Sequence, residues 1–259
     1  MTIFENELDL KIYDNILTAG RGHSKHCLKS AIQHLEKSLL IKEIDREMSV
    51  FRAITAEEEA ATAIFLILKE KQYENAKKIK FKNHSYKQAL SPFLDRVGEF
   101  LFKTTKVDNF PFGEKFHLKL EGSEKEKKLM LAFEIGGKYA YPIPPLNFSI
   151  SVNGMPYYFK EELNSLASQN NVNEVRKYIA DLANRRNEIL YANSQGVPEI
   201  TGSIDSYLKS RINTCIKFIR LYALISPYDE KALFVQHVLN SFLIMMGAIE
   251  SSDDIEPQA

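Results

Sequence analysis

The chain has 259 residues, of which 44% are hydrophobic and 26% are charged, so it can bury a sizeable core and is not a disordered chain. Its 34 basic and 34 acidic residues give a formal net charge of zero, so overall charge does not indicate nucleic-acid or membrane binding, and any such site must be a local patch. The first residues lack the order of a signal peptide and no apolar stretch could span a bilayer, so we expect a soluble, cytoplasmic protein.

Apolar residues recur three and four positions apart over most of the chain, which is typical of amphipathic helices. Pro92 has no amide donor, so the third predicted helix must be kinked there or start afresh. Ser226-Pro227 resembles a capped helix start, and the helix after it is apolar on nearly all sides, which predicts burial in a bundle or a subunit interface. The predicted helices cover residues 24–48, 49–71, 85–104, 172–193, 203–225 and 226–249.

Residues 114–160 alternate between apolar and polar side chains, which predicts three or four half-buried antiparallel strands. Gly122-Ser123 and Asn153-Gly154 are turn signals between them. The expected fold is therefore α+β and mainly α, a helical bundle with an inserted small antiparallel β-sheet. Its parts are the first bundle helices in residues 1–113, the sheet insertion in 114–160, the last bundle helices in 161–250 and a disordered acidic tail in 251–259.

One charged residue interrupts the apolar stripe of the helix predicted at residues 172–193. The stripe runs through Leu182 and Ile189, and Arg186 lies between them. An arginine on a core stripe must be paired, open onto a cleft or functional, because burying an unpaired charge costs several kcal/mol. The helix predicted at residues 49–71 has a similar gap at Glu57 or Glu58, either of which could pair with Arg186. Two interpretations follow, a structural salt bridge that sets helix register and a polar cleft between the helices.

The neighbours of Arg186 favour phosphate recognition. Asn187 and Tyr191 are four residues apart, so they share a helix face next to that of Arg186. A guanidinium, an amide and a phenol can bind phosphate, and with an acid–base group they could cleave RNA without a metal. Histidine suits the acid–base task better than Tyr191, because the ordinary pKa of tyrosine is about 10. The alternative is that Tyr191 is an interface aromatic.

The segment between the second and third predicted helices is rich in lysine, with aromatic residues interleaved. Such a pattern suits single-stranded RNA, where charges follow the phosphates and rings stack on bases. The alternative is a solvated lysine-rich loop. The RNA-binding candidates are Lys77, Lys78, Lys80, Lys82, His84, Tyr86 and Lys87, together with Arg185 beside the arginine on the stripe.

The sequence contains no pattern typical of a metal or cofactor site. None of the six histidines has a glutamate three residues before it, as a di-iron bundle requires, and no zinc spacing or Gly-rich phosphate loop is present. Cys27 and Cys215 lie far apart in helical patterns, which predicts reduced core residues. We therefore expect no cofactor and no metal.

The segment around Arg186 resembles the signature of the HEPN superfamily, helical bundles with an Arg-x(4–6)-His motif and a polar residue commonly just after the arginine. Arg186 matches the arginine, Asn187 the polar residue, and Tyr191 stands where the histidine would be. A second part of the chain is similar to the Ala-Glu-Glu…Lys…His-x-x-Lys arrangement of the abortive-infection branch, through Ala56-Glu57-Glu58, Lys69 and His84-Ser85-Tyr86-Lys87.

This resemblance implies a homodimer in which two arginine-motif helices face each other across a shared cleft. RNA would be the ligand, a metal-independent endoribonuclease the activity, and a prokaryotic toxin or phage-defence system the context. Arg186, Asn187 and Tyr191 would form the site, with Glu58 (or Glu57) orienting Arg186. The alternatives are a non-catalytic helical scaffold, whose last helix and inserted sheet bind a partner protein, and a nucleotide-binding sensor that uses the same polar cleft.

Overall fold

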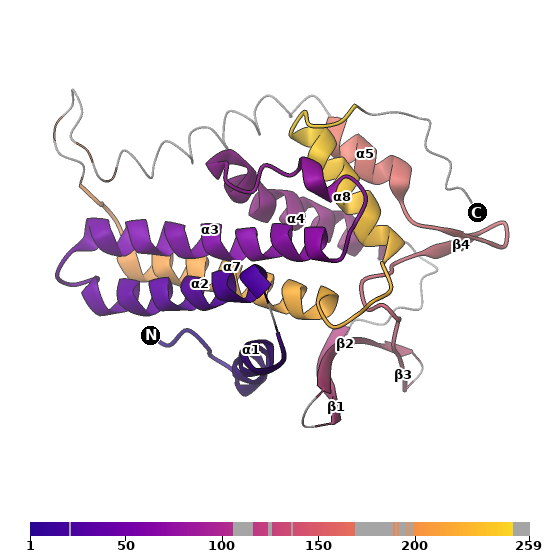
Figure 1. The fold of residues 1–259 in the computed structure, drawn as a ribbon, viewed down its shortest axis with the longest axis horizontal. Helices are drawn as coiled ribbons and strands as arrows, with labels where there is room; N and C mark the ends of the chain where they lie inside the picture. Colours follow the sequence, from indigo (N-terminus) through magenta and orange to yellow (C-terminus); the bar gives the residue numbers. More distant parts are fainter. Residues whose placement is uncertain are drawn as a thin grey trace.

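The computed structural model describes residues 1–20, 22–105, 116–123, 126–135, 137–168, 189, 191, 196 and 199–250. In these residues the protein is mainly helical with small antiparallel sheets, which confirms the expected α+β class (Figure 1). The helices are α1 (Glu7–Ala19), α2 (Gly22–Ile41), α3 (Arg46–Glu70), the 3-10 turn η1 (Ala76–Lys78), α4 (His84–Thr105), α5 (Lys160–Ser168), α7 (Ile204–Ile225) and α8 (Leu233–Met245). The strands are β1 (Phe116–Ser123), β2 (Glu126–Ile135), β3 (Lys138–Ala140), β4 (Ile150–Val152) and β5 (Met155–Tyr157).

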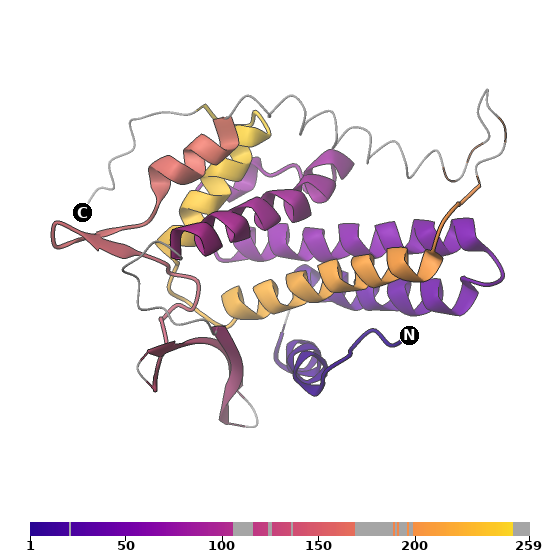
Figure 2. The ribbon, with the colours of Figure 1, turned by 180° about the vertical axis from the view of Figure 1, so that it is seen from behind.

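Helix α3 is the centre of the molecule. Figure 1 shows α2 and α3 side by side, and Figure 2 shows α7 along the same pair. Small residues allow this close packing: Ser38 and Ser49 are fully buried between α2 and α3, and each hydroxyl donates to the backbone carbonyl of the other residue, at 2.7 and 2.9 Å. Every residue of α3 from 60 to 68 is buried, because helices pack against it on several sides.

The remaining helices pack around α2, α3 and α7 and complete the core. Figure 2 shows α4, α5 and α8 grouped together. The ring centre of Phe242 in α8 lies within 6.0 Å of the ring centres of Phe65, Tyr86 and Phe93. Helix α1 is held against α7 by Arg220, which donates to both carboxylate oxygens of buried Asp9 at 2.6 and 2.8 Å. Helices from before and after the strands thus share one hydrophobic core.

The strands form a three-stranded sheet in the order β1-β2-β3 and a separate β4-β5 hairpin. The hairpin turn at Asn153-Gly154 is confirmed, with φ angles of 52° and 81° at the two residues, as a tight hairpin turn requires. Gly122 and Ser123 instead belong to the end of β1, where they pair with Lys127 and Glu126 of β2, and residues 124–125 lie outside the described residues.

Several predicted boundaries were wrong. Helix α1 was not predicted, and the first long helix ends at Ile41 rather than at residue 48, because Asp45 caps α3 by accepting from the amide of Met48. The helix predicted at 85–104 is confirmed as α4, which continues through Pro92, so of the two predicted alternatives the fresh start does not occur. Ser226 ends α7 rather than beginning the last helix, which starts at Leu233. The helix predicted at 172–193, apart from residues 189 and 191, and the tail at 251–259 lie outside the described residues.

Candidate functional site

Two adjacent glutamates of α3 are buried and face different neighbours. Glu57 is 5% exposed and Glu58 is 3% exposed. The prediction that a carboxylate of this run lies in the core is confirmed, and it holds for both residues. Glu57 pairs with Arg211 of α7, whereas Glu58 contacts residues in the first turn of α4. The structure thus brings two buried carboxylates to the junction of α3, α4 and α7.

Glu58 holds the ring of His84, the first residue of α4. The Nδ1 atom of His84 lies 2.9 and 2.8 Å from the two carboxylate oxygens of Glu58. A carboxylate can only accept, so Nδ1 carries a proton and Nε2 is the nitrogen that can exchange one. The side chain of His84 is 46% exposed while that of Glu58 is 3% exposed. This arrangement, a buried carboxylate that orients a solvent-facing imidazole, is one that general acid–base catalysis uses.

Two further residues of α4 reach the same carboxylate. Gln88 donates from Nε2 to Glu58 Oε1 at 3.2 Å, and Lys87 Nζ lies 4.0 Å from Glu58 Oε2. His84, Lys87 and Gln88 are spaced three and four residues apart, so one face of the first helical turns presents all three. The combined contacts place positive charge and hydrogen-bond donors around Glu58, which offsets part of its desolvation.

On the other side of the junction, Arg211 forms an ion pair with Glu57 and lies over the ring of Tyr207, with 4.8 Å from the guanidinium carbon to the ring centre. Burial is the largest single effect and would lower the pKa of Arg211, but the charges and hydrogen bonds of Glu57 and Tyr207 together outweigh burial and raise that pKa above its ordinary value. Arg211 therefore stays charged at every physiological pH.

Between these groups lies a cavity of about 400 Å³, which we call the α3/α4/α7 cavity. This volume is in the range of about 300–1,000 Å³ typical of ligand pockets. Its polar lining includes Glu57, Glu58, Gln88 and Arg211, and its apolar lining includes Val50, Ile54, Ile189, Ile204 and the ring of Tyr207. Two buried polar atoms that belong to lining residues, Gln88 Oε1 and Arg211 Nε, have no hydrogen-bond partner within the described part of the chain.

The predicted arginine site lies mostly outside the described residues. Arg185, Arg186 and Asn187 lie outside the described residues, so their positions and any pairing of Arg186 with Glu58 stay predictions. Two residues that follow them are described: Ile189 lines the cavity, and Tyr191 is 67% exposed. Glu58, the predicted orienting carboxylate, also lines this cavity.

The lysine-rich segment divides into an exposed part and a buried part. Lys77, Lys78, Lys80 and Lys82 are exposed and lead directly into His84. Tyr86 is 4% exposed and packs against Phe242, so this ring is not accessible to a base and we remove it from the RNA-binding candidates. Lys69 is also structural, because it donates to the carbonyl of Ile79 at 3.0 Å and lies 4.4 Å from the centre of the Phe81 ring.

Sequence reasoning missed Arg211 and Gln88. Arg211 lies between Leu208 and Cys215 at helical spacing, so the signal that singled out Arg186 was present here as well. Gln88 follows His84 by four residues, one turn along the same helix. Nothing in the sequence alone distinguishes this amide from a surface glutamine.

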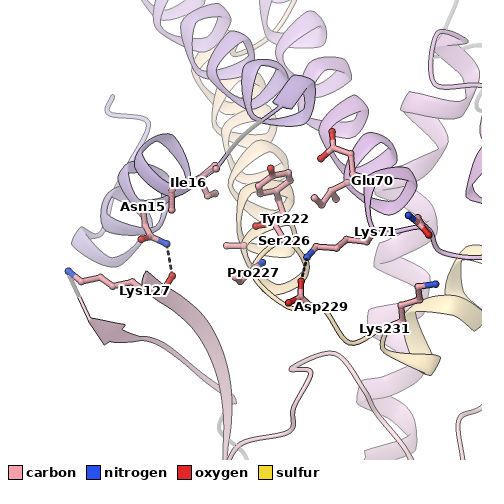
Figure 3. A pocket seen from close by; sticks show the side chains of 15 residues that line it. Asn15, Ile16, Glu70, Lys71, Lys127, Tyr222, Ser226, Pro227, Asp229 and Lys231 are labelled. Atoms are coloured by element: carbon pink, nitrogen blue, oxygen red, sulfur yellow. Dashed lines mark hydrogen bonds and ion pairs between the residues drawn. The ribbon is translucent and has the colours of Figure 1, made fainter. Parts of the chain in front are cut away.

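A second cavity, of about 620 Å³, lies where the C-terminal ends of α1, α3 and α7 approach β2 (Figure 3). Several of its polar groups are paired: Asn15 donates to the carbonyl of Lys127 at 2.9 Å, and Lys71 donates to Asp229 at 3.2 Å. Glu70 accepts from Ser24 at 2.9 Å. None of the unpartnered buried atoms named above belongs to this lining, so the α3/α4/α7 cavity is the stronger site.

No helix in the described residues combines the length and apolar character needed to cross a bilayer. No group of three or more His, Cys, Asp or Glu side chains in these residues could hold a metal ion.

No protein-family model, curated protein or solved structure gave a significant match to the chain.

Proposed function

We propose that the protein is a HEPN-like, metal-independent endoribonuclease that binds RNA at the junction of α3, α4 and α7. The observation that carries this proposal is the contact between buried Glu58 and half-exposed His84. The sequence left the acid–base role with Tyr191, whose ordinary pKa is poorly suited to it. His84 is better suited, since the ordinary pKa of histidine lies near neutrality.

The proposed chemistry needs no metal. Nε2 of His84 takes the proton from a ribose 2′-hydroxyl, and the 2′-oxygen attacks the adjacent phosphorus. The bond to the 5′-oxygen breaks, that oxygen takes a proton from water, and the products carry a 2′,3′-cyclic phosphate and a 5′-hydroxyl. Lys87 would stabilise the charge that develops on the phosphorane, as would Arg186 and Asn187 if they adopt the positions that the sequence predicts. Glu58 keeps the imidazole in the reactive tautomer.

The exposed lysines beside the site would guide the strand to it. Lys77, Lys78, Lys80 and Lys82 lie in the segment that ends at His84, and none of them forms an ion pair with another described residue. A row of lysines can follow the phosphates of a single strand without reading its sequence. Arg185, which the sequence predicts to bind RNA, would extend this row of basic residues.

We also propose that the protein works as a cytoplasmic homodimer in a toxin or phage-defence system. The resemblance of the two sequence motifs to the HEPN superfamily is the basis for proposing both the homodimer and this biological context. Cys27 and Cys215 are both buried and unpaired, and burial, with Glu59, raises the pKa of the Cys27 thiol to about 11. Protonated, buried thiols of this kind suit a reducing compartment.

Cleavage of a labelled single-stranded RNA in the presence of EDTA tests the proposed activity. The wild-type protein should release fragments with 2′,3′-cyclic phosphate ends, and His84→Ala should cleave about 100-fold more slowly, as expected for loss of a general base. His26→Ala removes an exposed histidine of α2 and should cleave at the wild-type rate. Arg186→Ala should also lose activity while keeping the helical circular dichroism of the wild type. Equal rates for His84→Ala and the wild type would contradict the proposal.

A non-catalytic scaffold is the second candidate, and the strand segment favours it. Tyr139, Ile143, Val152 and Met155 are exposed at 53%, 65%, 44% and 72%, and the strands extend away from the helices (Figure 1). Helix α8, the other surface expected to bind a partner, packs against α5 and α4. If the wild-type protein is monomeric by light scattering and leaves RNA intact, the scaffold would be favoured over the ribonuclease.

A further inference from the structure

Strand β1 has a free backbone edge. It is an outer strand of the three-stranded sheet, and its pairing with β2 uses only one of its two edges. No other strand in the described residues pairs with the second edge, and Figure 1 shows β1 at the margin of the molecule. An unpaired edge presents N–H and C=O groups to any further strand, so β1 is a candidate interaction surface.

Two hydrogen bonds on β2 identify the residues of β1 that face this free edge. The carbonyls of Lys127 and Leu129 accept from side chains of α1 and of the segment after α7, at 2.9 Å each, so they point away from β1. Their partners in β1 are Gly122 and Leu120, whose backbone groups therefore point away from β2. Because alternate residues of a strand face alternate edges, the N–H and C=O of Leu118 also face the free edge.

The charged side chains of β1 form a pattern that is complementary to itself. Lys119 and Glu121 are both exposed and lie on the same face of the strand, on either side of Leu120. If two copies of β1 pair antiparallel about a two-fold axis at Leu120, Lys119 of each copy lies opposite the partner's Glu121, with Cα atoms about 4.5 Å apart. Opposite charges in such cross-strand pairs stabilise a sheet.

The same charges disfavour the neighbouring registers. An axis at Lys119 would place this lysine opposite the partner's Lys119, and an axis at Glu121 would place two glutamates opposite each other. Like charges directly opposite each other destabilise a sheet, so the register about Leu120 is preferred. On the other face of the strand, Leu118 and Leu120 pack against the core, and pairing about Leu120 would continue this apolar face into the second copy.

We infer that β1 is an interface between two copies of this chain, which pair antiparallel about Leu120 and join their sheets into one. This inference goes beyond the proposed function, because no residue of β1 lines the α3/α4/α7 cavity. The interface also differs from the contact between arginine-motif helices that the HEPN resemblance implies. If both contacts form, the assembly contains more than two copies.

Charge reversal on β1, followed by light scattering, tests this pairing. Lys119→Glu and Glu121→Lys each place like charges opposite each other, so either variant alone should have half the molar mass of the wild-type protein. An equimolar mixture of the two variants should return to the wild-type mass, because each then supplies the charge that the other lacks. Lys138→Glu reverses an exposed lysine of β3, at the opposite edge of the sheet, and is the matched control that should keep the wild-type mass.

The mixture separates lost pairing from lost folding, since two misfolded variants would not recover on mixing. Single variants with the wild-type mass, a mixture that fails to recover, or a monomeric wild-type protein would each overturn the interface. RNA cleavage by the same proteins keeps this inference apart from the proposed activity. A monomer that cleaves RNA would overturn the interface and leave the ribonuclease intact, whereas recovery on mixing in a protein that leaves RNA intact would support the interface and contradict the ribonuclease.

Discussion

Glu57 and Glu58 are consecutive residues that serve two different helices. Successive side chains of an α-helix are about 100° apart, so two adjacent residues on a central helix face different neighbours. Glu57 reaches α7 through Arg211, and Glu58 reaches α4 through His84 and Gln88. The same buried run therefore holds a structural ion pair on one side and an acid–base pair on the other.

Breaking the ion pair between Glu57 and Arg211 should lower the free energy of unfolding. Glu57→Leu leaves a buried guanidinium without its counter-charge, so the free energy of unfolding should fall by about 3 kcal/mol. This value is at the low end for buried ion pairs because the side chain of Arg211 is 23% exposed. Adding Arg211→Met removes the stranded charge and should recover most of this loss. Urea unfolding of the single and double variants measures both. A double variant no more stable than Glu57→Leu would contradict the account.

His237 of α8 predicts a pH dependence of stability. Burial, with the charge of Lys160, lowers the pKa of His237 below its ordinary value of 6.5. The unfolded chain then binds the proton more tightly than the folded chain, so this residue lowers stability as pH falls through about 6.5 and has no such effect well above it. His237→Gln should flatten the fall in unfolding free energy between about pH 7 and 5. A slope equal to that of the wild type would contradict this assignment.

At the scale of elements, Gly98 is a weak point of α4. A glycine within a helix costs about 1 kcal/mol relative to alanine, and a Cβ atom added at Gly98 would meet nothing within 4 Å. Gly98→Ala should therefore raise the free energy of unfolding by up to about 1 kcal/mol. Gly202 has equally open surroundings but a φ of +90°, so Gly202→Ala should destabilise the protein. Thermal unfolding of the two variants measures both effects. If Gly98→Ala also lowers the unfolding temperature, the expected gain in stability at this position is contradicted.

The sequence predicted elements well where one buried face continues for several turns. Helices α3, α4 and α7 were located for this reason, whereas the short α1 was missed because its buried apolar face has only Ile12, Tyr13 and Ile16. The start of α8 was misplaced because a tertiary contact outweighs a good local capping signal. Tyr228, inside the expected first turn, instead donates its hydroxyl to the carbonyl of Leu129 in β2 at 2.9 Å.

The candidate site was predictable only in part. A gap in an apolar stripe identified Glu57 and Glu58, because a charge at a core position is visible in the pattern. The contact between Glu58 and His84 joins residues 26 positions apart on different helices, and periodicity carries no information on which helices pack together. The unpartnered atoms of Gln88 and Arg211 depend on which atom of each side chain is already bonded, and this is decided by the tertiary structure rather than by the sequence pattern.

At the scale of the whole molecule, a net charge of zero means that RNA binding should depend on the local lysines. Replacing Lys77, Lys78, Lys80 and Lys82 with alanine should weaken binding of single-stranded RNA and reduce its salt dependence. Each lost phosphate contact should reduce the slope of log affinity against log salt by about 0.7. Alanine at four other exposed lysines (Lys11, Lys29, Lys37 and Lys209) changes the net charge equally and should leave the slope unchanged. Fluorescence anisotropy at several salt concentrations gives these slopes. Equal losses in both variants would mean that overall charge, and not the segment before His84, attracts the RNA.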